Sequence, residues 1–496
     1  MRPKNAKKKK DWFKPKPFPH FTNRIEPKDR RDVVRIVQNH EYVAGHAFYP
    51  LLYYEIRQRK WQRKNRKIGI KKRPIAYATH LDTHIYAWYA HQMSAQYETL
   101  LKSPQTEGLS ECITAYRRIE RPDGRGKRNI DFACEVFNEI KRRKDCAVLA
   151  FDVKSFFPTI DHQRLKSAWC KLLGVSRLPK AESNIFKAVT QFSYVLRDDL
   201  RLDSGGFDEK RLAALRKEGF HSFFRSGEEF RQLVVENPDI RIYKNQKKKN
   251  GRHVGIPQGL PISPVLANLY MYEFDRQMLE SVANKFKAFY RRYSDDIMVV
   301  CDKKDADFIV FLVRRFIRKY AGLDLAKNKT ERFECYEENE MLRVKKIVAA
   351  GKKGKNSLTY LGFEFHGDKT LLRGSTLAGY HRKMRKSISA VVARSKKAAV
   401  KNGTTPIVYT RRLYRNYTHF GKRKRNYRIP AYEWLSSGDG TYHPEQYMRK
   451  KKHWGNLITY AHDASEIFDD DNDAIKKQVR RHFVLFQKYL SRSKTS

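Results

Sequence analysis

Short apolar runs alternate with basic stretches along this chain, and one of the clearest apolar runs covers residues 147–153. A continuous apolar segment of this length predicts a strand that is buried on both faces. The run places Asp152 at the C-terminal tip of the predicted strand, and a helical pattern at 162–173 follows. A lone aspartate after a strand is usually a cap or a turn residue, so Asp152 needs a partner before it predicts any chemistry.

A second apolar run, at residues 297–300, directly follows the polar tetrad Tyr293–Asp296. The alternating residues 286–290 before the tetrad predict the hairpin partner of this second strand, so both adjacent aspartates fall at the turn. By itself such a turn is most often solvated. Together with the strand that ends at Asp152, it supplies carboxylates on two short apolar strands, and neighbouring strands of this kind can hold a hard cation such as Mg²⁺.

Helical periodicity accounts for much of the remaining chain. The pattern predicts helices at 84–97, 130–141, 265–278 and 306–320, a strand at 358–365 with Gly362 in its middle, and a mostly helical region beyond residue 375. Cationic stripes lie in that last region at 383–386, 411–415, 422–425 and 449–452. This mixture predicts an α+β fold with a basic helical C-terminal region.

Two segments do not match the pattern of a packed core. Residues 1–30 are rich in Lys, Pro and Phe, which predicts an arm that lies over the main body or along a phosphate backbone. Residues 195–250 are polar, charged and irregular with two short helical patterns, which predicts an insertion that projects from the body.

The charge of the chain indicates its class of partner. There are 104 Lys and Arg residues against 54 Asp and Glu residues, a formal net charge of +50. Because basic residues occur throughout the chain and no stretch reaches the length of a spanning helix, we expect a nucleic acid partner and no membrane. The six cysteines show no CxxC pair or zinc spacing and the N-terminal sequence has no apolar signal region, so we expect core thiols in a reducing cytoplasm.

Two further segments are candidates for contact with nucleic acid. Residues 57–73 are rich in Lys and Arg and lead into a short strand, which indicates either a solvated helix face or a basic hairpin that grips template or triphosphate. The loop 255–264 contains two Gly and three Pro, which together define one backbone path. Such a loop suits either close approach to a base pair or sugar, or a tight structural turn.

Carboxylates on two strands of a strongly cationic chain match the needs of nucleotidyl transfer. This chemistry commonly uses two divalent ions about 3.5–4 Å apart, one that activates the attacking oxygen and one that binds the leaving phosphate. Asp152 and Asp295 would bridge the ions, and Asp296 would complete the minimal carboxylate set.

Five short motifs occur in the order and approximate spacing of the palm motifs of reverse transcriptases. They are Phe151–Phe157, Gly255–Gly259 followed by Ser263–Pro264, Tyr293–Asp296, Lys329–Thr330 and Tyr360–Gly362. On these motifs, residues 50–370 resemble the reverse transcriptase superfamily. The resemblance implies the right-hand polymerase fold, with a basic N-terminal arm (1–50), fingers (51–145), a palm (146–370) that contains the insertion, and a helical thumb with a nucleic-acid-binding region (371–496).

The resemblance also implies the roles of individual residues. Asp152, Asp295 and Asp296 correspond to the catalytic carboxylates, and these three together with Val153 correspond to the metal-binding residues. The implied cofactor is Mg²⁺, present as two ions, with Mn²⁺ as a substitute.

Residues near the carboxylates would contact the nucleotide and the primer. Phe157 falls at the position of the steric gate that excludes the ribose 2′-hydroxyl and so favours deoxynucleotides. The implied nucleotide-binding residues are Arg73, Arg117, Phe157, Gln258, Gly259 and Lys329, and the implied primer grip is Leu361 with Gly362.

Two positions depart from the family pattern. Ser294 stands where Ala, Val, Met or Cys is common, and Ala326 stands where group II intron relatives often carry Asn. No HNH, GIY-YIG or RNase H set of residues follows the palm motifs, which argues against a mobile intron enzyme or a retrovirus-like enzyme.

Three other segments, at 16–21, 85–90 and 115–117, look like bacterial abortive-infection and defence-associated reverse transcriptases. That resemblance implies a role in anti-phage defence. In the family it goes with a noncoding RNA as template in some members, with untemplated or protein-primed synthesis in others, and with homo-oligomers in many.

The main prediction is therefore an RNA-directed DNA polymerase that takes an RNA template and dNTPs and releases a DNA product. Three alternatives stay open: untemplated or protein-primed deoxynucleotide synthesis at the same site, a catalytically idle RNA-binding scaffold, and an RNA-dependent RNA polymerase. The aromatic ring of Phe157 disfavours the last of these.

Overall fold

The computed structural model describes residues 11–62, 67–201, 209–326, 330–348, 356–422, 427–436, 442–451, 455–469 and 473–495. The chain divides into two compact units, each built from two separate stretches of sequence. The first unit comprises Met1–Arg118 and Leu149–Thr330, and the second comprises Ile119–Val148 and Glu331–Ser496. The predicted division into fingers, palm and thumb is not tested by this partition and stays a prediction.

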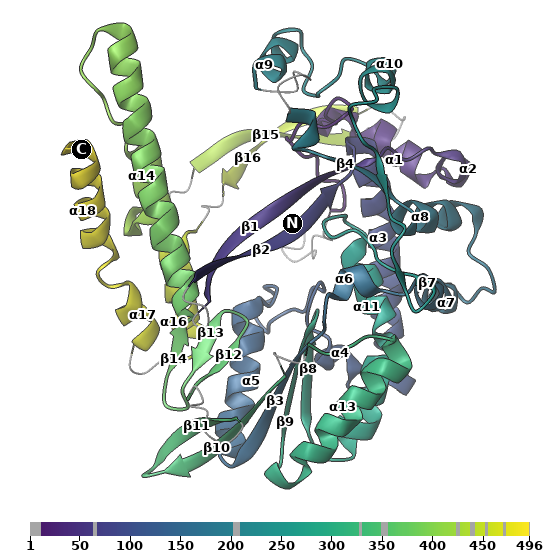
Figure 1. The fold of residues 1–496 in the computed structure, drawn as a ribbon, viewed down its shortest axis with the longest axis vertical. Coiled ribbons are helices and arrows are strands. Elements are labelled where there is room, and N and C mark those ends of the chain that lie inside the picture. Colours follow the sequence, from purple (N-terminus) through teal and green to yellow (C-terminus); the bar gives the residue numbers. More distant parts are fainter. Residues whose placement is uncertain are drawn as a thin grey trace. The chain divides into compact units, whose positions relative to one another are not determined.

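Three neighbouring strands and the turn between two of them carry the predicted carboxylates, all of which belong to the first unit. The strands are β3 (Cys146–Asp152), β9 (Asp296–Cys301) and β8 (Phe289–Tyr293), hydrogen-bonded in the order β3-β9-β8, and Figure 1 shows them side by side. Strands β8 and β9 are antiparallel, with Tyr293 opposite Asp296. Nearly all residues of β3 and β9 are buried, in agreement with the continuous apolar runs of the sequence.

Helices pack around this sheet. Helix α7 (His162–Leu173) has the bounds that the sequence predicted, and it packs against α11 (Ser263–Tyr270). Helix α12 (Tyr272–Met278) packs against α13 (Ala306–Ala321), and α3 (His80–Leu100) packs against both α7 and α11. The remaining helical elements of this unit are η1 (Pro27–Asp29), α1 (Arg30–Gln38), α2 (His40–Gly45), η2 (Pro104–Thr106), α4 (Leu109–Cys112), α6 (Phe156–Thr159), α8 (Lys180–Thr190), η3 (Asp199–Arg201), α9 (Glu209–Lys217), α10 (Gly227–Phe230), η4 (Arg231–Val235), η5 (Leu279–Asn284) and η6 (Lys303–Asp305).

The described residues of the basic segment 57–73, which are 57–62 and 67–73, lie on two paired strands, in agreement with the predicted hairpin. Strands β1 (Leu51–Gln62) and β2 (Lys67–Tyr77) pair antiparallel and belong to a sheet of order β2-β1-β4-β5. The other two strands of that sheet are β4 (Ser193–Leu196) and β5 (Tyr243–Lys244), and a separate pair consists of β6 (Lys248–Lys249) and β7 (Arg252–His253).

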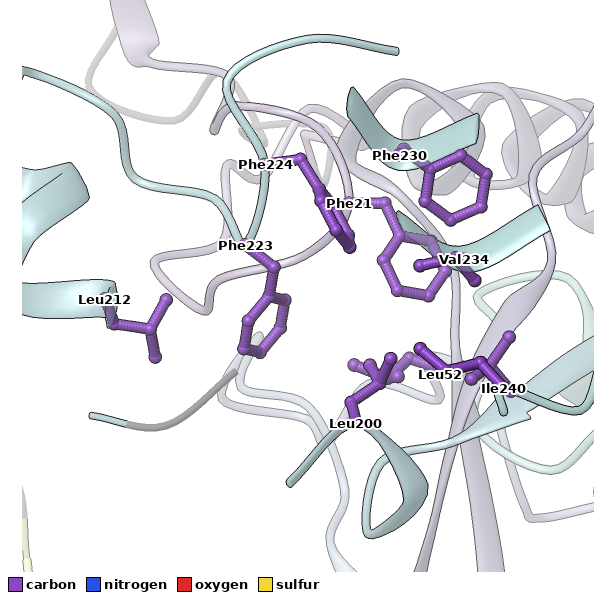
Figure 2. Packing of buried hydrophobic residues seen from close by; sticks show 10 residues of the cluster. Phe21, Leu52, Leu200, Leu212, Phe223, Phe224, Phe230, Val234 and Ile240 are labelled. Atoms are coloured by element: carbon purple, nitrogen blue, oxygen red, sulfur yellow. The ribbon is translucent and has the colours of Figure 1, made fainter. Parts of the chain in front are cut away.

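The N-terminal arm and the insertion at 195–250 share a buried apolar cluster. Phe21 of the arm is only 1% exposed, and Figure 2 shows its ring among Phe224, Phe230 and Val234 of the insertion. The full cluster is Phe21, Leu52, Val195, Leu200, Leu212, Phe223, Phe224, Phe230, Val234 and Ile240. The described part of the expected arm, from residue 11 on, therefore lies over the body, and the described phenylalanines of the insertion pack against it and do not simply project, because they need this burial.

The second unit is built on helix α5 (Asn129–Arg143), whose buried ring Phe137 stacks on Phe365 and Phe468 with ring centroids 4.7 and 5.8 Å apart. Its strands are β10 (Glu331–Glu338), β11 (Met341–Ile347), β12 (Leu358–Tyr360), β13 (Phe363–Phe365), β14 (Thr370–Leu372), β15 (Tyr427–Ser436) and β16 (Tyr442–Lys451). Its other helical elements are α14 (Gly374–Asn402), the longest helix in the described part of the chain, α15 (Arg411–Tyr417), η8 (His419–Lys422), α16 (Leu457–Ile467), α17 (Ala474–Val479) and α18 (His482–Thr495).

The predicted α+β class is confirmed, and four details of the prediction are wrong. The helix expected at 265–278 is interrupted at Met271 between α11 and α12, and the strand expected at 358–365 is the hairpin β12–β13, with Leu361 and Gly362 in its turn. The stripe expected on a helix at 449–452 falls on β16 as far as residue 451, and the hairpin partner expected at 286–290 is β8, which begins three residues later.

Two composition-based expectations can also be compared with the structure. All six cysteines are buried free thiols, as expected. Within the described ranges no helix combines the length and the apolar character that crossing a membrane requires.

Candidate active site

Main-chain hydrogen bonds join the end of β3 to the turn between β8 and β9. The amide N–H of Val153 donates to the carbonyl oxygen of Asp295 over 3.0 Å. On the other side of β3, the amide of Ala326 donates to the carbonyl oxygen of Asp152 over 2.8 Å. The structure therefore brings together the residues on which the sequence placed the carboxylates, because adjacent strands of one sheet carry them.

The turn itself consists of only two residues, Ser294 and Asp295. Ser294 has φ 61°, whereas the φ of Asp295 is not positive, and a positive φ at the first central residue alone distinguishes a type II′ hairpin turn from type I′. Such turns match the twist of antiparallel strands. Asp296 is the first residue of β9 and not part of the turn, so the two adjacent carboxylates leave the backbone from different local geometries.

A fully buried ion pair supports this turn from within the unit. The guanidinium of Arg292 on β8 makes two hydrogen bonds to the carboxylate of Asp275 on α12, at 2.7 and 2.6 Å, and both side chains are 0% exposed. A third bond runs from Nη1 of Arg292 to the carbonyl oxygen of Ser294 over 3.1 Å. Burial alone would lower the pKa of Arg292, but the Asp275 carboxylate beside it outweighs burial and raises that pKa.

The segment before α5 runs along β8 and ends beside the turn. Both the amide and the hydroxyl of Thr114 donate to the carbonyl oxygen of Arg292 over 3.0 Å, and the Tyr116 hydroxyl is 2.9 Å from Oγ of Ser294. Partial burial raises the pKa of Tyr116, and the negative charges of Asp295 and Asp296 add to that rise. The phenol of Tyr116 therefore lies within the electrostatic influence of both carboxylates.

The chemistry of the donors fits a hard divalent cation, although their side chains are not gathered around one point. Within the described ranges, no group of three or more His, Cys, Asp or Glu side chains is arranged to hold a metal ion. Mg²⁺ is usually bound by one or two carboxylates, with water and substrate phosphates completing its shell. The backbone places Asp152 and Asp295 suitably for that mode, and the assignment of Asp152, Val153, Asp295 and Asp296 as metal-binding residues stays a prediction.

The loop 255–264 takes one defined path beside the segment that carries Phe157. The amide of Ile256 donates to the carbonyl oxygen of Phe157 over 3.1 Å, and the amide of Gly255 donates to that of Ile160 over 2.8 Å. The ring of Phe157 is half-buried and lies 5.5 Å from that of Phe156. The expected steric-gate residue is thus fixed between β3 and the loop.

Gly259 is required by the close approach of strand β2. It has φ 124°, and a Cβ atom there would lie 2.3 Å from the carbonyl oxygen of Ala76. The amide of Ala76 donates to the carbonyl oxygen of Gln258 over 2.9 Å, while the side chain of Gln258 is exposed. Arg73 is also exposed on β2, three residues before Ala76. The structure therefore places Gln258 and Gly259 against strand β2, the strand that also carries Arg73.

Arg117, a fourth predicted nucleotide contact, is engaged by the protein itself. Its guanidinium makes two hydrogen bonds to the Glu98 carboxylate, at 2.7 and 2.8 Å, and two more to main-chain carbonyl oxygens of Ser110 and Ile113. Its side chain is 6% exposed. Contact with a triphosphate would require these hydrogen bonds to break. In this geometry the Arg117 side chain holds its own loop in place.

The remaining predicted site residues lie elsewhere. Lys329 falls outside the described residues. Leu361 and Gly362 belong to the second unit, where both have positive φ, 43° and 94°, as in a type I′ hairpin turn. The carbonyl oxygen of Leu361 accepts a hydrogen bond from Nδ2 of Asn129 over 3.2 Å, and their role as a primer grip stays a prediction.

Sequence reasoning missed the Asp275–Arg292 pair and the contact of Tyr116 with the tetrad. Arg292 carried a signal, because it alternates with Tyr290 on one face of the predicted hairpin strand, and a charged residue on a buried face must be paired. Asp275 carried none, since it lies on a helix with several other charged residues.

Comparison with known proteins bears on this site. Residues 204–365 match the family model described as reverse transcriptase (RNA-dependent DNA polymerase). The matched range includes the loop 255–264, the tetrad and Gly362, and it begins after Asp152. The match supports the reverse transcriptase superfamily for this chain, whereas the bacterial defence subgroup stays a prediction. No curated protein matches the chain.

Among solved structures, the chain is similar to telomerases. Apo telomerase from Candida tropicalis, truncated from the C-terminal domain, is 10% identical with a TM-score of 0.36, and the alignment covers 65% of this chain and 57% of that one. Telomerase from Candida albicans in complex with a TWJ fragment of telomeric RNA is 11% identical with a TM-score of 0.32, over 70% of this chain and 50% of that one. The chain thus spans about half the length of these telomerases.

Proposed function

We propose that this protein is an RNA-directed DNA polymerase that extends a primer by nucleotidyl transfer at Asp152, Asp295 and Asp296. The observation that carries the proposal is the 3.0 Å hydrogen bond between Val153 and Asp295, which sets the tip of β3 against the β8–β9 turn. The reverse transcriptase match of residues 204–365 supports the same reaction.

The three aspartates would hold Mg²⁺, as two ions, with the carbonyl oxygen of Val153 nearby, and Mn²⁺ would substitute. When bound, these ions would lower the pKa of the attacking primer hydroxyl and neutralise the charge on the phosphates. The protein's own contribution is position, because strands β3 and β9 and the two-residue turn are rigid elements that leave the carboxylates little backbone freedom.

The elements around the carboxylates would select and align the nucleotide. Phe157 would exclude the ribose 2′-hydroxyl, the exposed Gln258 and Gly259 would face the nascent base pair, and Arg73 would contact the triphosphate together with Lys329. The closeness of Gly259 to Ala76 supports this arrangement, since it holds the loop and strand β2 in one geometry.

The polyanionic partner would be an RNA template. Which RNA serves as the template is a separate proposal. The net charge of +50 favours binding to a phosphate backbone, which provides affinity without sequence information. A dedicated noncoding RNA as template and a role in bacterial anti-phage defence rest on the resemblance of segments 16–21, 85–90 and 115–117 alone. Homo-oligomer formation and a cytoplasmic location are expectations of the same kind.

The first test is to purify the protein with its retained nucleic acid, add Mg²⁺ and labelled dNTPs, and sequence both the retained RNA and the product. We expect a DNA product complementary to a discrete retained RNA, and we expect RNase pretreatment to abolish it. A product of low complexity that survives RNase would instead establish untemplated synthesis at the same carboxylates.

The catalytic assignment is tested with the double variant Asp295→Asn/Asp296→Asn. Losing two charged ligands should reduce synthesis by at least about 10³-fold while RNA retention changes little, because the basic surface is untouched. The matched control is Asp32→Asn, which removes an exposed carboxylate of the same unit and should leave the rate of synthesis unchanged. Synthesis that survives in the double variant would contradict the assignment.

A further inference from the structure

The hydroxyl groups of Tyr116 and Ser294 meet at the turn that carries Asp295. The two oxygens are 2.9 Å apart, and either hydroxyl can be the donor. The Tyr116 side chain is otherwise open to solvent, with 49% of the residue exposed, whereas Ser294 is 5% exposed. This contact joins a segment far away in the sequence to the turn between β8 and β9.

Both residues of the pair occupy an unfavourable backbone region. Tyr116 has φ 65° and Ser294 has φ 61°, and non-glycine residues adopt the left-handed region only when their surroundings hold them there. A tyrosine has no short polar side chain to bond its own backbone in this conformation, unlike Asn or Asp. Two such residues joined through their side chains indicate a geometry that the fold imposes.

Hydrogen bonds on either side of Tyr116 impose its position. Thr114 is bound twice to the carbonyl oxygen of Arg292, and Nδ2 of the buried Asn268 donates to the carbonyl oxygen of Ala115 over 2.9 Å. On the other side, Arg117 is held by Glu98. With both neighbours fixed, the backbone of Tyr116 is fixed as well, and its hydroxyl lies 2.9 Å from Oγ of Ser294.

Ser294 is held in a similar way from two directions. Its carbonyl oxygen accepts from the buried Arg292, and its hydroxyl contacts Tyr116. The next residue, Asp295, is bound through its own carbonyl oxygen to Val153. Removing the Tyr116 contact would therefore free one side of a turn whose other contacts remain.

We infer that Tyr116 and Ser294 form a positioning pair, in which the phenol fixes the Ser294 hydroxyl and thereby the orientation in which Asp295 meets the cation and the reacting phosphate. The inference rests on the proposed function, and it assigns to this chain's serine a role that the apolar residues common at that position cannot perform.

The test uses Tyr116→Phe and Ser294→Ala, each of which removes one hydroxyl, together with their double variant. Single-turnover extension by the full chain should show a rate constant at saturating dNTP that is about 2- to 13-fold lower in each single variant, the range expected for one hydrogen bond between neutral groups. The dissociation constant of dNTP should change by less than about 3-fold. The double variant should be no slower than the slower single variant, since both substitutions remove the same bond.

Two further variants separate positioning from general structure. Tyr89→Phe also removes a phenol hydroxyl of this unit, one that lies 3.4 Å from Nδ1 of His40, and it should change the extension rate by less than about 2-fold. Ser294→Gly relieves the backbone strain and removes the hydroxyl, so it should be as slow as Ser294→Ala. If Ser294→Gly extended at the wild-type rate, backbone strain and not the hydroxyl would be responsible, and the inference would fail.

A second readout does not depend on synthesis. Mn²⁺ alone, followed by electron paramagnetic resonance, should bind several-fold more weakly to Tyr116→Phe and Ser294→Ala than to the wild type or Tyr89→Phe, with Asp295→Asn as the variant that loses the site. Equal Mn²⁺ affinity in all of them would overturn the inference.

The two readouts distinguish the possible failures. A wild type that makes no product but shows the expected order of Mn²⁺ affinities refutes the proposed function and supports the pair. A wild type that synthesises DNA, with hydroxyl variants equal to it in rate and affinity, supports the function and refutes the pair. Rates that multiply in the double variant also refute it, because independent effects cannot come from one shared bond.

Discussion

At the scale of single residues, the candidate site depends on backbone positions that tolerate few side chains. Gly259 has no space for a Cβ atom against Ala76, and Ser294 and Tyr116 adopt left-handed conformations. Phe157 is held differently, because its carbonyl oxygen accepts a hydrogen bond from the amide of Ile256, which fixes the backbone from which the ring extends. If this ring selects between deoxynucleotides and ribonucleotides, it does so by steric exclusion, and the selectivity should depend on the size of the side chain alone.

Replacing Phe157 with alanine should therefore relax sugar selection. We expect the ratio of kcat/KM for dNTP to kcat/KM for the matching rNTP to fall by roughly 10- to 100-fold in Phe157→Ala, because the space for the 2′-hydroxyl opens. Steady-state incorporation of single nucleotides opposite one template base measures this ratio. The control Phe157→Tyr keeps the ring and should retain most of the discrimination, and an unchanged ratio in the alanine variant would rule out the gate.

At the scale of elements, the β8–β9 hairpin depends on an ion pair with helix α12. Arg292 and Asp275 are both fully buried, and Tyr290 also donates to Asp275 over 2.6 Å. A buried pair of this kind costs desolvation, which its hydrogen bonds offset, so it specifies geometry more than it adds stability. The carbonyl oxygen of Ser294 shares the same guanidinium, and thus one network sets both the packing of α12 and the shape of the turn.

Breaking this pair on one side should be strongly destabilising. Arg292→Met leaves the buried Asp275 carboxylate with the Tyr290 hydroxyl but without its cation and should lower the free energy of unfolding by about 3–5 kcal/mol, and Asp275→Asn should act in the same direction. The control Arg35→Ala breaks the exposed pair with Asp32, whose side chains are 80% and 69% exposed, and should cost less than about 1 kcal/mol. Urea unfolding followed by tryptophan fluorescence measures the difference, and equal costs for both pairs would contradict the burial argument.

At the scale of the whole molecule, the excess of positive charge makes acid conditions unfavourable. The formal net charge is +50 at pH 7, and the chain has 16 histidines that can add to it. Three buried histidines of the first unit, His20, His80 and His84, lie close to one another and have lowered pKa values, mainly because of burial. The pKa of His20 is lowered to about 3 and that of His80 to about 4, with Arg24 and Lys16 as further cationic neighbours.

Stability should consequently decrease as the pH falls. Above pH 6.5 these histidines are neutral in the folded and in the unfolded protein, and their contribution to stability is fully present. Below pH 6.5 the histidines of the unfolded chain bind protons, whereas the buried histidines of the folded chain do not. Each such histidine lowers the free energy of unfolding by up to about 1.4 kcal/mol per pH unit between 6.5 and its folded pKa. Urea midpoints at pH 7.5, 6.0 and 5.0 measure the slope. His80→Phe, which preserves an aromatic ring against Phe18, should reduce that slope, and a flat profile in the wild type would contradict the expectation.

Local sequence patterns predict much of this fold, whereas contacts between distant parts of the chain determine the rest. The apolar run that forms β3 and the amphipathic pattern of α7 are set by neighbouring residues, so the strand end at Asp152 and the tetrad turn were predictable. The break at Met271 gave no signal, because the apolar pattern runs on through it. The β15–β16 hairpin was missed because basic residues obscured the strand pattern within a mostly helical region.

The candidate site residues divide in the same way. Asp152, Asp295 and Asp296 belong to short recognisable motifs, whereas the contacts of Tyr116 with Ser294 and of Asp275 with Arg292 join residues that are distant in sequence or lie on different elements. Chain packing creates those contacts, and one sequence contains no pattern that reveals which residues pair, even where a buried charge such as Arg292 requires a partner. The engagement of Arg117 by Glu98 could not be inferred for the same reason.

The interleaved order of the two units has a consequence for synthesis on the ribosome. Helix α5 emerges early, but Phe365 and Phe468, against which Phe137 packs, follow hundreds of residues later. At about 5–20 residues per second, the apolar face of α5 waits on the order of tens of seconds for these partners, and the sequence of the first unit is completed at Thr330, before either partner is made. The apolar face of α5 is therefore without these packing partners during most of translation. A chaperone that recognises apolar helices should bind there first.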